Sequence, residues 1–360
     1  MSVHELLLPA GTLGKLEMAL AYGADAVYAG AAGLSMRPDV AALSQDELAG
    51  GLERCHARGR RLYVALNSMY FDRDFAALEA WLEETTALPF DGLIVSDLGA
   101  LSLVRERRPE VPLHISTQAG VANARAARFY AEAGASRVIL ARECSIADAA
   151  HVALAGDVEV EVFVHGAMCV AVSGRCLLSA HLSGRSGSTG DCKHSCRWEW
   201  QLVEKRRPGE TLPVFEDGGQ TFLMGSKDLC LVEHLPALVH SGVRSLKVEG
   251  RMKSEHYVAA VARVYRAALD AYGADPEAYR YDPEWRRELE SVSHRPYGVG
   301  FALGYPQHQP ESLQTHNHPI SRTRVIAYVA SAPGPRPDEA PGDAIPLEIK
   351  NPFRPGQTLE

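Results

Sequence analysis

The feature that most constrains the fold is an alternation of short apolar segments with helix-like segments, repeated eight times along the chain. The strand candidates are 5–11, 24–30, 61–67, 91–97, 113–118, 137–143, 158–165 and 245–250. Several of them are apolar on both faces, which is typical of parallel strands covered by helices. The alternation therefore predicts an α/β fold, a (β/α)8 TIM-like barrel. A doubly wound open sheet is the alternative.

Helix-like segments fill the connections between these strands. The helix candidates are 15–22, 45–57, 75–86, 99–107, 122–133, 146–153 and 255–272. Ser44 is a plausible N-cap of the second, and Gly23 ends the first. Residues 255–272 carry a broad apolar stripe at helical spacing, as expected for a helix that packs on a barrel.

One connection is far longer than the others. Residues 166–243 separate the seventh strand from the eighth, and long insertions of this kind are usually functional or disordered. In a barrel this insertion opens on the C-terminal face, where active sites are built. We therefore predict a barrel over 1–275 with its insertion at 166–243, a helical and irregular connection over 276–322, and the start of a small β domain over 323–360, incomplete at the end of the sequence.

The insertion carries a group of cysteines in a glycine- and serine-rich context. Cys169, Cys176, Cys192 and Cys196 lie close together in the sequence, and Cys230 follows. Their irregular spacing favours an iron–sulfur cluster over a zinc site with paired knuckles. Separate catalytic or core cysteines are the alternative. Cys230 is expected to begin a helix, a position that would stabilise its thiolate.

Polar side chains follow the predicted strands and would converge on the C-terminal face of the barrel. Arg142, Lys247 and Arg251 could hold a carboxylate or a phosphate there. His165 and Glu249 are the candidate catalytic residues. Asn67, Asp97, Gln118 and Glu143 also lie at these strand ends. Mutual neutralisation of Lys247 by Glu249 and of Arg142 by Glu143 is an equally plausible interpretation.

Residues of the insertion are also compatible with two other functions, proteolysis and RNA binding. Cys169 and His165 could form the nucleophile and base of a protease, although an orienting acid is not evident in the sequence. Lys193, Arg197 and Trp198 belong to a stretch where cations alternate with aromatic residues, which suits single-stranded RNA. A solvated loop would explain that stretch equally well.

Composition narrows the class of protein. The 360 residues are 46% hydrophobic and carry a formal net charge of −8, which counts modestly against binding nucleic acid through the overall field. Apolar runs stay below the roughly 20 residues that span a bilayer. The N-terminus lacks the basic and apolar regions of a secretory signal. We expect a cytoplasmic protein without membrane contact, in which clustered cysteines favour metal or redox chemistry.

The stretch around the first two cysteines resembles a known family. Glu161-x-Phe163-x-x-Gly-Ala-Met-Cys169-x4-Gly-x-Cys176-x-Leu-Ser matches the signature of the collagenase-like peptidases of unassigned mechanism, the U32 type, at every fixed position. Similarity continues in PAGTLGKLEMALAYGADAVYAG, in HISTQAGVAN and in the stretch from SKDLC to RAALDAY. It covers nearly the whole chain, and the branch it resembles most hydroxylates the wobble uridine of tRNA with prephenate.

The resemblance implies a TIM-like barrel and an enzyme that makes 5-hydroxyuridine in tRNA with prephenate as co-substrate and without O2. It also implies a [4Fe-4S] cluster, and the residue-wise match assigns its ligands as Cys169, Cys176, Cys192 and Cys230, with Cys196 as a competitor. The expected partners are tRNA, prephenate and an electron-transfer protein. The alternatives are a collagenase-like peptidase and a cluster-bearing subunit of another hydroxylase, acting on rRNA cytidine or a ubiquinone ring.

Overall fold

Eight parallel strands close into a barrel, as the alternation predicts. Neighbouring strands pair in the order of the sequence, and β13 pairs with both β7 and β1, which closes the ring. The strands are β1 (Glu5–Pro9), β2 (Ala26–Gly30), β3 (Arg61–Leu66), β4 (Gly92–Val95), β5 (Leu113–Ile115), β6 (Arg137–Ile139), β7 (Glu159–Ala167) and β13 (Ser245–Val248). The prediction of a TIM-like barrel is confirmed, and the open-sheet alternative is excluded by this closure.

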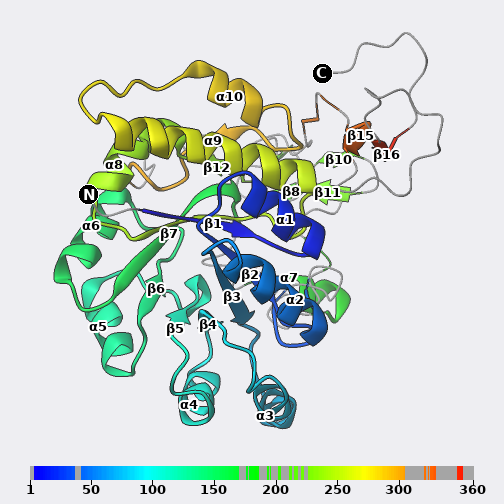
Figure 1. The fold of residues 1–360 in the computed structure, drawn as a ribbon, viewed down its shortest axis with the longest axis vertical. Helices are drawn as coiled ribbons and strands as arrows, with labels where there is room; N and C mark the ends of the chain where they lie inside the picture. The colour runs from blue at the N-terminus through cyan, green and yellow to red at the C-terminus, as the bar shows by residue number, and fades with distance from the viewer. Residues whose placement is uncertain are drawn as a thin grey trace.

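Helices follow the strands and surround the barrel (Figure 1). They are α1 (Leu13–Ala21), α2 (Gln45–His56), α3 (Phe75–Glu84), α4 (Leu98–Arg107), α5 (Ala124–Glu132), α6 (Ile146–Ala155), α8 (Leu235–His240) and α9 (Glu255–Ala274). Ser44 caps α2 through a capping box with Glu47, as its position in the sequence predicts. The long helix α9 buries its apolar stripe and packs against α1 and β1.

This computed structural model describes residues 4–36, 42–169, 176, 178–185, 193, 195, 202–203, 211–212, 215–217, 220–222, 226–304, 320–321, 323, 325–329 and 347–351. The barrel lies almost wholly within these ranges. The predicted site residues Cys192, Cys196, Arg197 and Trp198 lie outside them.

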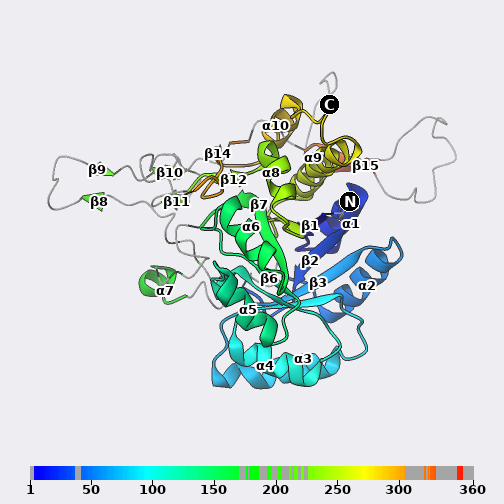
Figure 2. The ribbon, with the colours of Figure 1, turned by 90° about the vertical axis from the view of Figure 1, so that its left-hand side faces the viewer.

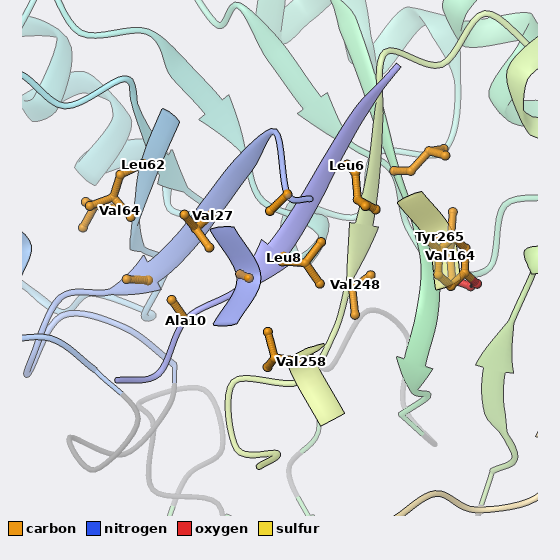
Figure 3. Packing of buried hydrophobic residues seen from close by; sticks show 14 of the residues in the cluster. Leu6, Leu8, Ala10, Val27, Leu62, Val64, Val164, Val248, Val258 and Tyr265 are labelled. Atoms are coloured by element: carbon orange, nitrogen blue, oxygen red, sulfur yellow. Dashed lines mark hydrogen bonds between the residues drawn. The ribbon is translucent and has the colours of Figure 1, made fainter. Parts of the chain in front are cut away.

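Two hydrophobic layers stabilise the barrel. Leu6 and Leu8 of β1 point outward into the layer beneath the helices, together with Val164, Val248 and Val258 (Figure 3). Leu7, between them, points into the lumen, where it packs with a second cluster. The other members of that cluster are Ala26, Tyr28, Tyr63, Ala65, Ile94 and Ile139, with Phe163 packed against them. Apolar side chains on both faces of a strand are thus explained by two separate cores.

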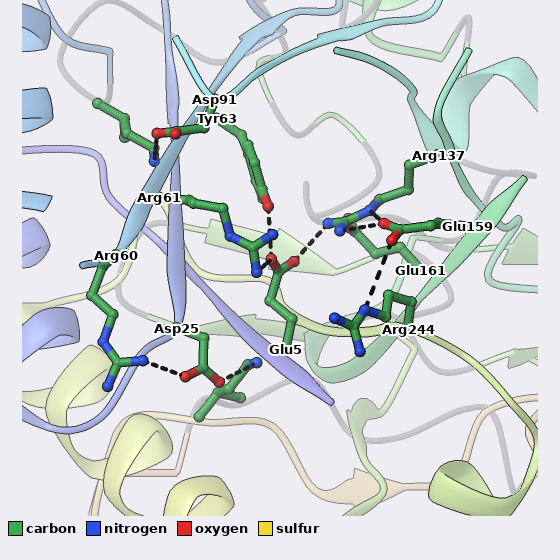
Figure 4. A network of polar contacts seen from close by, with 12 residues as sticks. Glu5, Asp25, Arg60, Arg61, Tyr63, Asp91, Arg137, Glu159, Glu161 and Arg244 are labelled. Atoms are coloured by element: carbon green, nitrogen blue, oxygen red, sulfur yellow. Dashed lines mark hydrogen bonds and ion pairs between the residues drawn. The ribbon is translucent and has the colours of Figure 1, made fainter. Parts of the chain in front are cut away.

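Charged residues at the amino ends of the strands fill the lower lumen (Figure 4). The Arg137 guanidinium lies 2.6 Å from Glu5, 3.0 Å from Glu161 and 2.8 Å from Glu159. The Tyr63 hydroxyl also donates to Glu5, at 2.6 Å. Burial alone would raise the pKa of Glu5, but the Arg137 charge and the Tyr63 hydrogen bond lower it overall. The Glu5 carboxylate therefore stays ionised inside the barrel.

The two ends of the insertion lie next to each other, because a strand near its C-terminal end pairs with the end of β7. β12 (Asp228–Cys230) runs antiparallel to the end of β7, and β14 (Tyr297–Gly298) pairs with β12. The predicted helix start at Cys230 is wrong, because this residue ends β12 and the helix α8 begins only at Leu235. The backbone groups at the end of β7 find partners in β12, and this pairing takes precedence over the local helix signal.

Further short elements belong to the insertion and to the region after α9. Figure 2 shows α7 (Leu178–Ser183), β8 (Leu202–Val203), β9 (Thr211–Leu212), β10 (Phe215–Asp217) and β11 (Gln220–Phe222) outside the ring of barrel helices. α10 (Pro283–Leu289) follows α9, and β15 (Ala327–Val329) pairs with β16 (Leu347–Ile349) in a two-stranded sheet. Among the described helices, none combines the length and apolarity needed to cross a membrane.

Candidate functional site

The carboxyl ends of β6, β7 and β13 bring cationic side chains to the C-terminal end of the barrel. Arg142 follows β6 and donates to the carbonyl of Ala167, at 2.6 Å. Its guanidinium also lies 3.2 Å from the Glu249 carboxylate and 4.0 Å from the ring centroid of Phe163. The sequence suggests Glu143 as the partner of Arg142, whereas in the structure Glu249 forms the ion pair with it. Arg142 and Glu249 are both largely buried, so their attraction is only weakly screened.

Lys247 lies deeper in the lumen, on β13. Its ammonium is 2.7 Å from Glu161, the residue that also contacts Arg137, and 4.3 Å from the Tyr28 ring centroid. Burial lowers the pKa of Lys247, and the negative charge of Glu161 opposes that shift. The predicted neutralisation of Lys247 is thus provided chiefly by Glu161, and this residue links the lower charge network to the site above it.

Arg251 is the third cation of this group, and it is almost fully buried. Its Nη1 atom lies 3.4 Å from the Ser35 hydroxyl, and its guanidinium is 6.0 Å from the Tyr28 ring. A side chain at Gly30 would collide with both polar groups, because a Cβ there would lie 2.3 Å from Arg251 Nη1 and 2.4 Å from Ser35 Oγ. The glycine that ends β2 therefore makes room for the cation.

We call Arg142, Lys247 and Arg251 the cationic group. Two carboxylates, Glu161 and Glu249, contact it, so these five side chains carry one net positive charge when all are ionised. Guanidinium groups bind carboxylates in a bidentate geometry, and partial burial strengthens such contacts. This arrangement suits a small anionic ligand.

Hydroxyl and amide side chains occupy the ends of β3 and β5 on the same rim. Asn67 follows β3, and its Nδ2 atom donates to Gln118 Oε1 at 2.7 Å. The Ser116 hydroxyl donates to the same oxygen at 2.9 Å. The sequence places Asn67 and Gln118 at strand ends without assigning them a role. Their direct contact depends on the closure of the barrel, which spacing alone does not show.

The structure separates His165 from the rim. Its ring lies outside the lumen, 5.2–5.9 Å from the ring centroids of Tyr257, Tyr265 and Tyr297. Complete burial among these rings lowers its pKa to about 3, so the imidazole is neutral at physiological pH. Cys169 is exposed while His165 is buried, so the described residues do not assemble the nucleophile–base pair that the protease hypothesis requires.

The predicted cluster ligands lie in different environments. Cys169 is exposed, and the partly buried Cys176 accepts a hydrogen bond from the Leu178 amide at 3.4 Å. Cys230 is buried, which raises its pKa to about 11, and its thiol is therefore protonated at neutral pH. Thiolates suit an iron–sulfur cluster, but within the part of the chain that the structure describes no three possible ligands converge on one point.

Of the three predicted RNA-binding residues, Lys193 lies within the described part of the chain. Lys193 is exposed, and its backbone amide donates to the Ser179 hydroxyl at 2.9 Å. This contact joins the stretch to α7, whose first turn contains the last residue of the sequence signature. The side chains of Arg197 and Trp198 lie outside the described residues.

A match to a family model decides the family. Residues 11–312 match the model described as peptidase family U32, which is most of the chain. The chain belongs to peptidase family U32. The resemblance inferred from the cysteine signature is thereby confirmed, and the described barrel is the scaffold on which this U32 member places its cationic group.

Curated relatives of this U32 chain carry different names. It is 38% identical over 312 residues to tRNA hydroxylation protein P1 of Bacillus subtilis, covering 87% of this chain and 74% of the relative. It is 35% identical to tRNA hydroxylation protein P of Escherichia coli, covering 99% and 85%. A collagenase of Porphyromonas gingivalis is 32% identical, covering 90% and 78%.

Proposed function

We propose that this U32 protein is a tRNA hydroxylase that converts wobble uridine to 5-hydroxyuridine with prephenate as co-substrate. The cationic group at the C-terminal end of the barrel is the observation that carries this proposal. Relatives named for tRNA hydroxylation cover most of the chain at 35–38% identity, which supports the reaction class. The names of these relatives do not identify the co-substrate, and the charges of the cationic group support a dicarboxylate.

Prephenate carries two carboxylates, and the site offers cations at two positions. Arg142 lies against Phe163, while Arg251 lies beside Ser35 and Tyr28. One carboxylate would bind to each guanidinium, with the ligand ring between the aromatic side chains. Lys247 would supply positive charge from below. Glu249 orients Arg142 and is the titratable carboxylate nearest to the bound anion.

We further propose a [4Fe-4S] cluster held by Cys169, Cys176, Cys192 and Cys230, with Cys196 as the competing fourth ligand. Such a cluster would exchange electrons or bind a substrate oxygen. Cys230 would have to lose its proton on binding, because its thiol has a pKa of about 11. Cluster loading should therefore release protons and increase with pH. Lys193, Arg197 and Trp198 are proposed to contact the tRNA.

The decisive experiment is nucleoside mass spectrometry of tRNA from a strain that lacks this gene. Loss of 5-hydroxyuridine derivatives, restored by the wild-type gene and not by an Arg142→Met variant, is the expected result. Unchanged tRNA nucleosides would refute the tRNA assignment. Purified protein that cleaves a collagen peptide, with cleavage abolished by Cys169→Ala, would instead favour a peptidase.

A further inference from the structure

We propose that Asn67 and Gln118, which we call the amide pair, form the subsite that recognises the uracil base. This inference rests on the proposed tRNA hydroxylation and adds the residues that would read its target. The sequence, the family match and the named relatives assign no role to either side chain. Four features of the described residues support the assignment.

The first feature is position. Asn67 directly follows β3, and Gln118 belongs to the short 3-10 helix Thr117–Ala119 that follows β5. Both residues are therefore at the carboxyl ends of barrel strands, where ligands of this fold bind. Each side chain is only partly buried, so a ligand can reach it. Ser96, at the end of β4 between them, fixes the Asn67 backbone by donating to its carbonyl at 3.1 Å.

The second feature is the hydrogen-bonding capacity that remains on the amide pair. Gln118 Oε1 accepts from both Asn67 and Ser116, so both of its lone pairs are used. Gln118 Nε2 donates to the Met36 thioether, which is a weak acceptor. Among the described residues, Asn67 Oδ1 accepts one bond, from the Met36 amide at 3.3 Å. The pair thus offers an N–H donor from Gln118 and an acceptor site on Asn67.

These two groups complement the polar edge of uracil. Uracil presents a carbonyl oxygen, O4, beside an N3–H donor. Gln118 Nε2 would donate to O4, and N3–H would donate to Asn67 Oδ1. A base extruded from an RNA loop is read in this way, through its pairing edge. Cytosine presents the opposite order of donor and acceptor, so the same two groups would disfavour it.

The third feature is the link between the amide pair and the cationic group. Ser35 contacts Arg251, and the next residue, Met36, contacts both Asn67 and Gln118. Consecutive Cα atoms are about 3.8 Å apart, so a single short loop joins the two groups. A base bound at the amide pair would therefore lie next to an anion bound at the cationic group. This is the arrangement that a reaction between two bound substrates requires.

The fourth feature is an apolar rim beside the amide pair. Met69 and Phe71 follow Asn67 in the chain and are 48% and 45% exposed, and Leu98 after β4 is 55% exposed. The Arg73 guanidinium lies 4.6 Å from the Phe71 ring centroid. Bases removed from a stack bind to such aromatic and guanidinium surfaces.

The test compares Gln118→Glu with the matched control Asn123→Asp. Gln118→Glu keeps the shape of the side chain and replaces its donor by a negatively charged acceptor. Asn123 is exposed and caps α5, five residues further along the chain. Asp caps helices as well as Asn, so the control adds the same charge near the same rim without removing a cap.

One readout is binding of a short RNA hairpin with a uridine in its loop, compared with binding of the same hairpin with an abasic site there. The other readout is hydroxylation of the uridine hairpin. We expect Gln118→Glu to weaken binding of the uridine hairpin by about 10-fold or more, which corresponds to about 1.4 kcal/mol, and to abolish its preference over the abasic one. Asn123→Asp should behave as wild type, and the KM for prephenate should be unchanged in both.

Binding by Gln118→Glu that equals wild type, or a rise in the KM for prephenate alone, would overturn the assignment. Should Gln118→Glu fail to fold, as judged by thermal unfolding, Gln118→Met removes the donor without adding charge and gives the same comparison. Failure of the proposed function has a different signature, because wild-type protein would then leave the uridine hairpin unmodified. The preference for uridine over the abasic hairpin still tests the amide pair in that case.

Discussion

The lower and upper parts of the barrel lumen use charged residues in opposite ways. Below, Arg137 contacts three carboxylates, and Tyr63 adds a further donor to Glu5. Above, among the described residues, the three cations of the cationic group contact two carboxylates, and the Gln118 amide contacts a weak acceptor. The carboxylates that surround Arg137 indicate a structural role for the lower network, whereas the excess of positive charge above suits an anionic ligand. In this lumen, the partners of a charged side chain distinguish a structural role from a binding role better than the presence of the charge does.

The largest expected effect comes from breaking the lower network at its centre. Arg137→Met removes the cation that Glu5, Glu159 and Glu161 share, leaving buried Glu5 with Arg61 and buried Glu161 with Lys247, and we expect it to lower the free energy of unfolding by about 3–5 kcal/mol. Chemical denaturation measures this change. Arg128→Met is the matched control, because Arg128 is 57% exposed and, in the part of the chain that the structure describes, its ion pair is with Asp157 at the surface. It should cost less than about 1 kcal/mol, and equal losses in the two variants would contradict a structural role specific to the lumen.

Lys247 lies at the boundary between the two parts, and its removal should affect both. Lys247→Met takes one partner from Glu161, which keeps Arg137, so we expect a smaller loss of about 2–3 kcal/mol in unfolding free energy. Binding of prephenate should weaken as well, which isothermal calorimetry measures. A variant that loses stability and retains full affinity would place Lys247 wholly in the lower network.

His165 predicts a pH dependence of stability. Its folded-state pKa of about 3 is far below the ordinary value of about 6.5, so protonation favours the unfolded chain. The stabilising contribution is complete above pH 6.5 and is lost toward pH 3, by about 1.4 kcal/mol for each pH unit. His165→Phe should flatten the curve of unfolding free energy against pH between 7 and 5. Parallel curves for the two proteins would show that His165 has the same pKa in the folded and unfolded states.

The smallest effect on stability is expected at Gly30. A methyl group there meets Arg251 Nη1 and Ser35 Oγ, which are buried and must shift, so Gly30→Ala should lower the unfolding free energy by about 1–2 kcal/mol. The displaced Arg251 should nevertheless raise the KM for prephenate by about 10-fold. Gly50→Ala in α2 makes the same substitution where a Cβ meets nothing within 4 Å. An unchanged KM in Gly30→Ala would remove Arg251 from the binding site.

The sequence predicts the barrel well because strand and helix periodicity report directly on burial. It also predicts that Arg142, Lys247 and Arg251 lie at strand ends, since the ends of parallel strands meet on one face. It does not predict their partners, because Glu161 and Glu249 belong to other strands and the pairing depends on how the ring closes. The predicted helix start at Cys230 is wrong for a similar reason. A short strand in an insertion carries little periodicity, and only its pairing with β7 reveals it.

The pairing of β7 with β12 has a consequence for how the protein could change over time. The chain leaves the barrel after Ala167 and returns at Asp228, and these two residues are direct partners across adjacent strands, about 4.8 Å apart. Arg295 clamps the junction by contacting both Asp228 and the Met168 carbonyl. The segment between these two positions therefore begins and ends at one paired junction on the barrel. A change in the length or sequence of this segment can leave the register of the eight barrel strands unaffected.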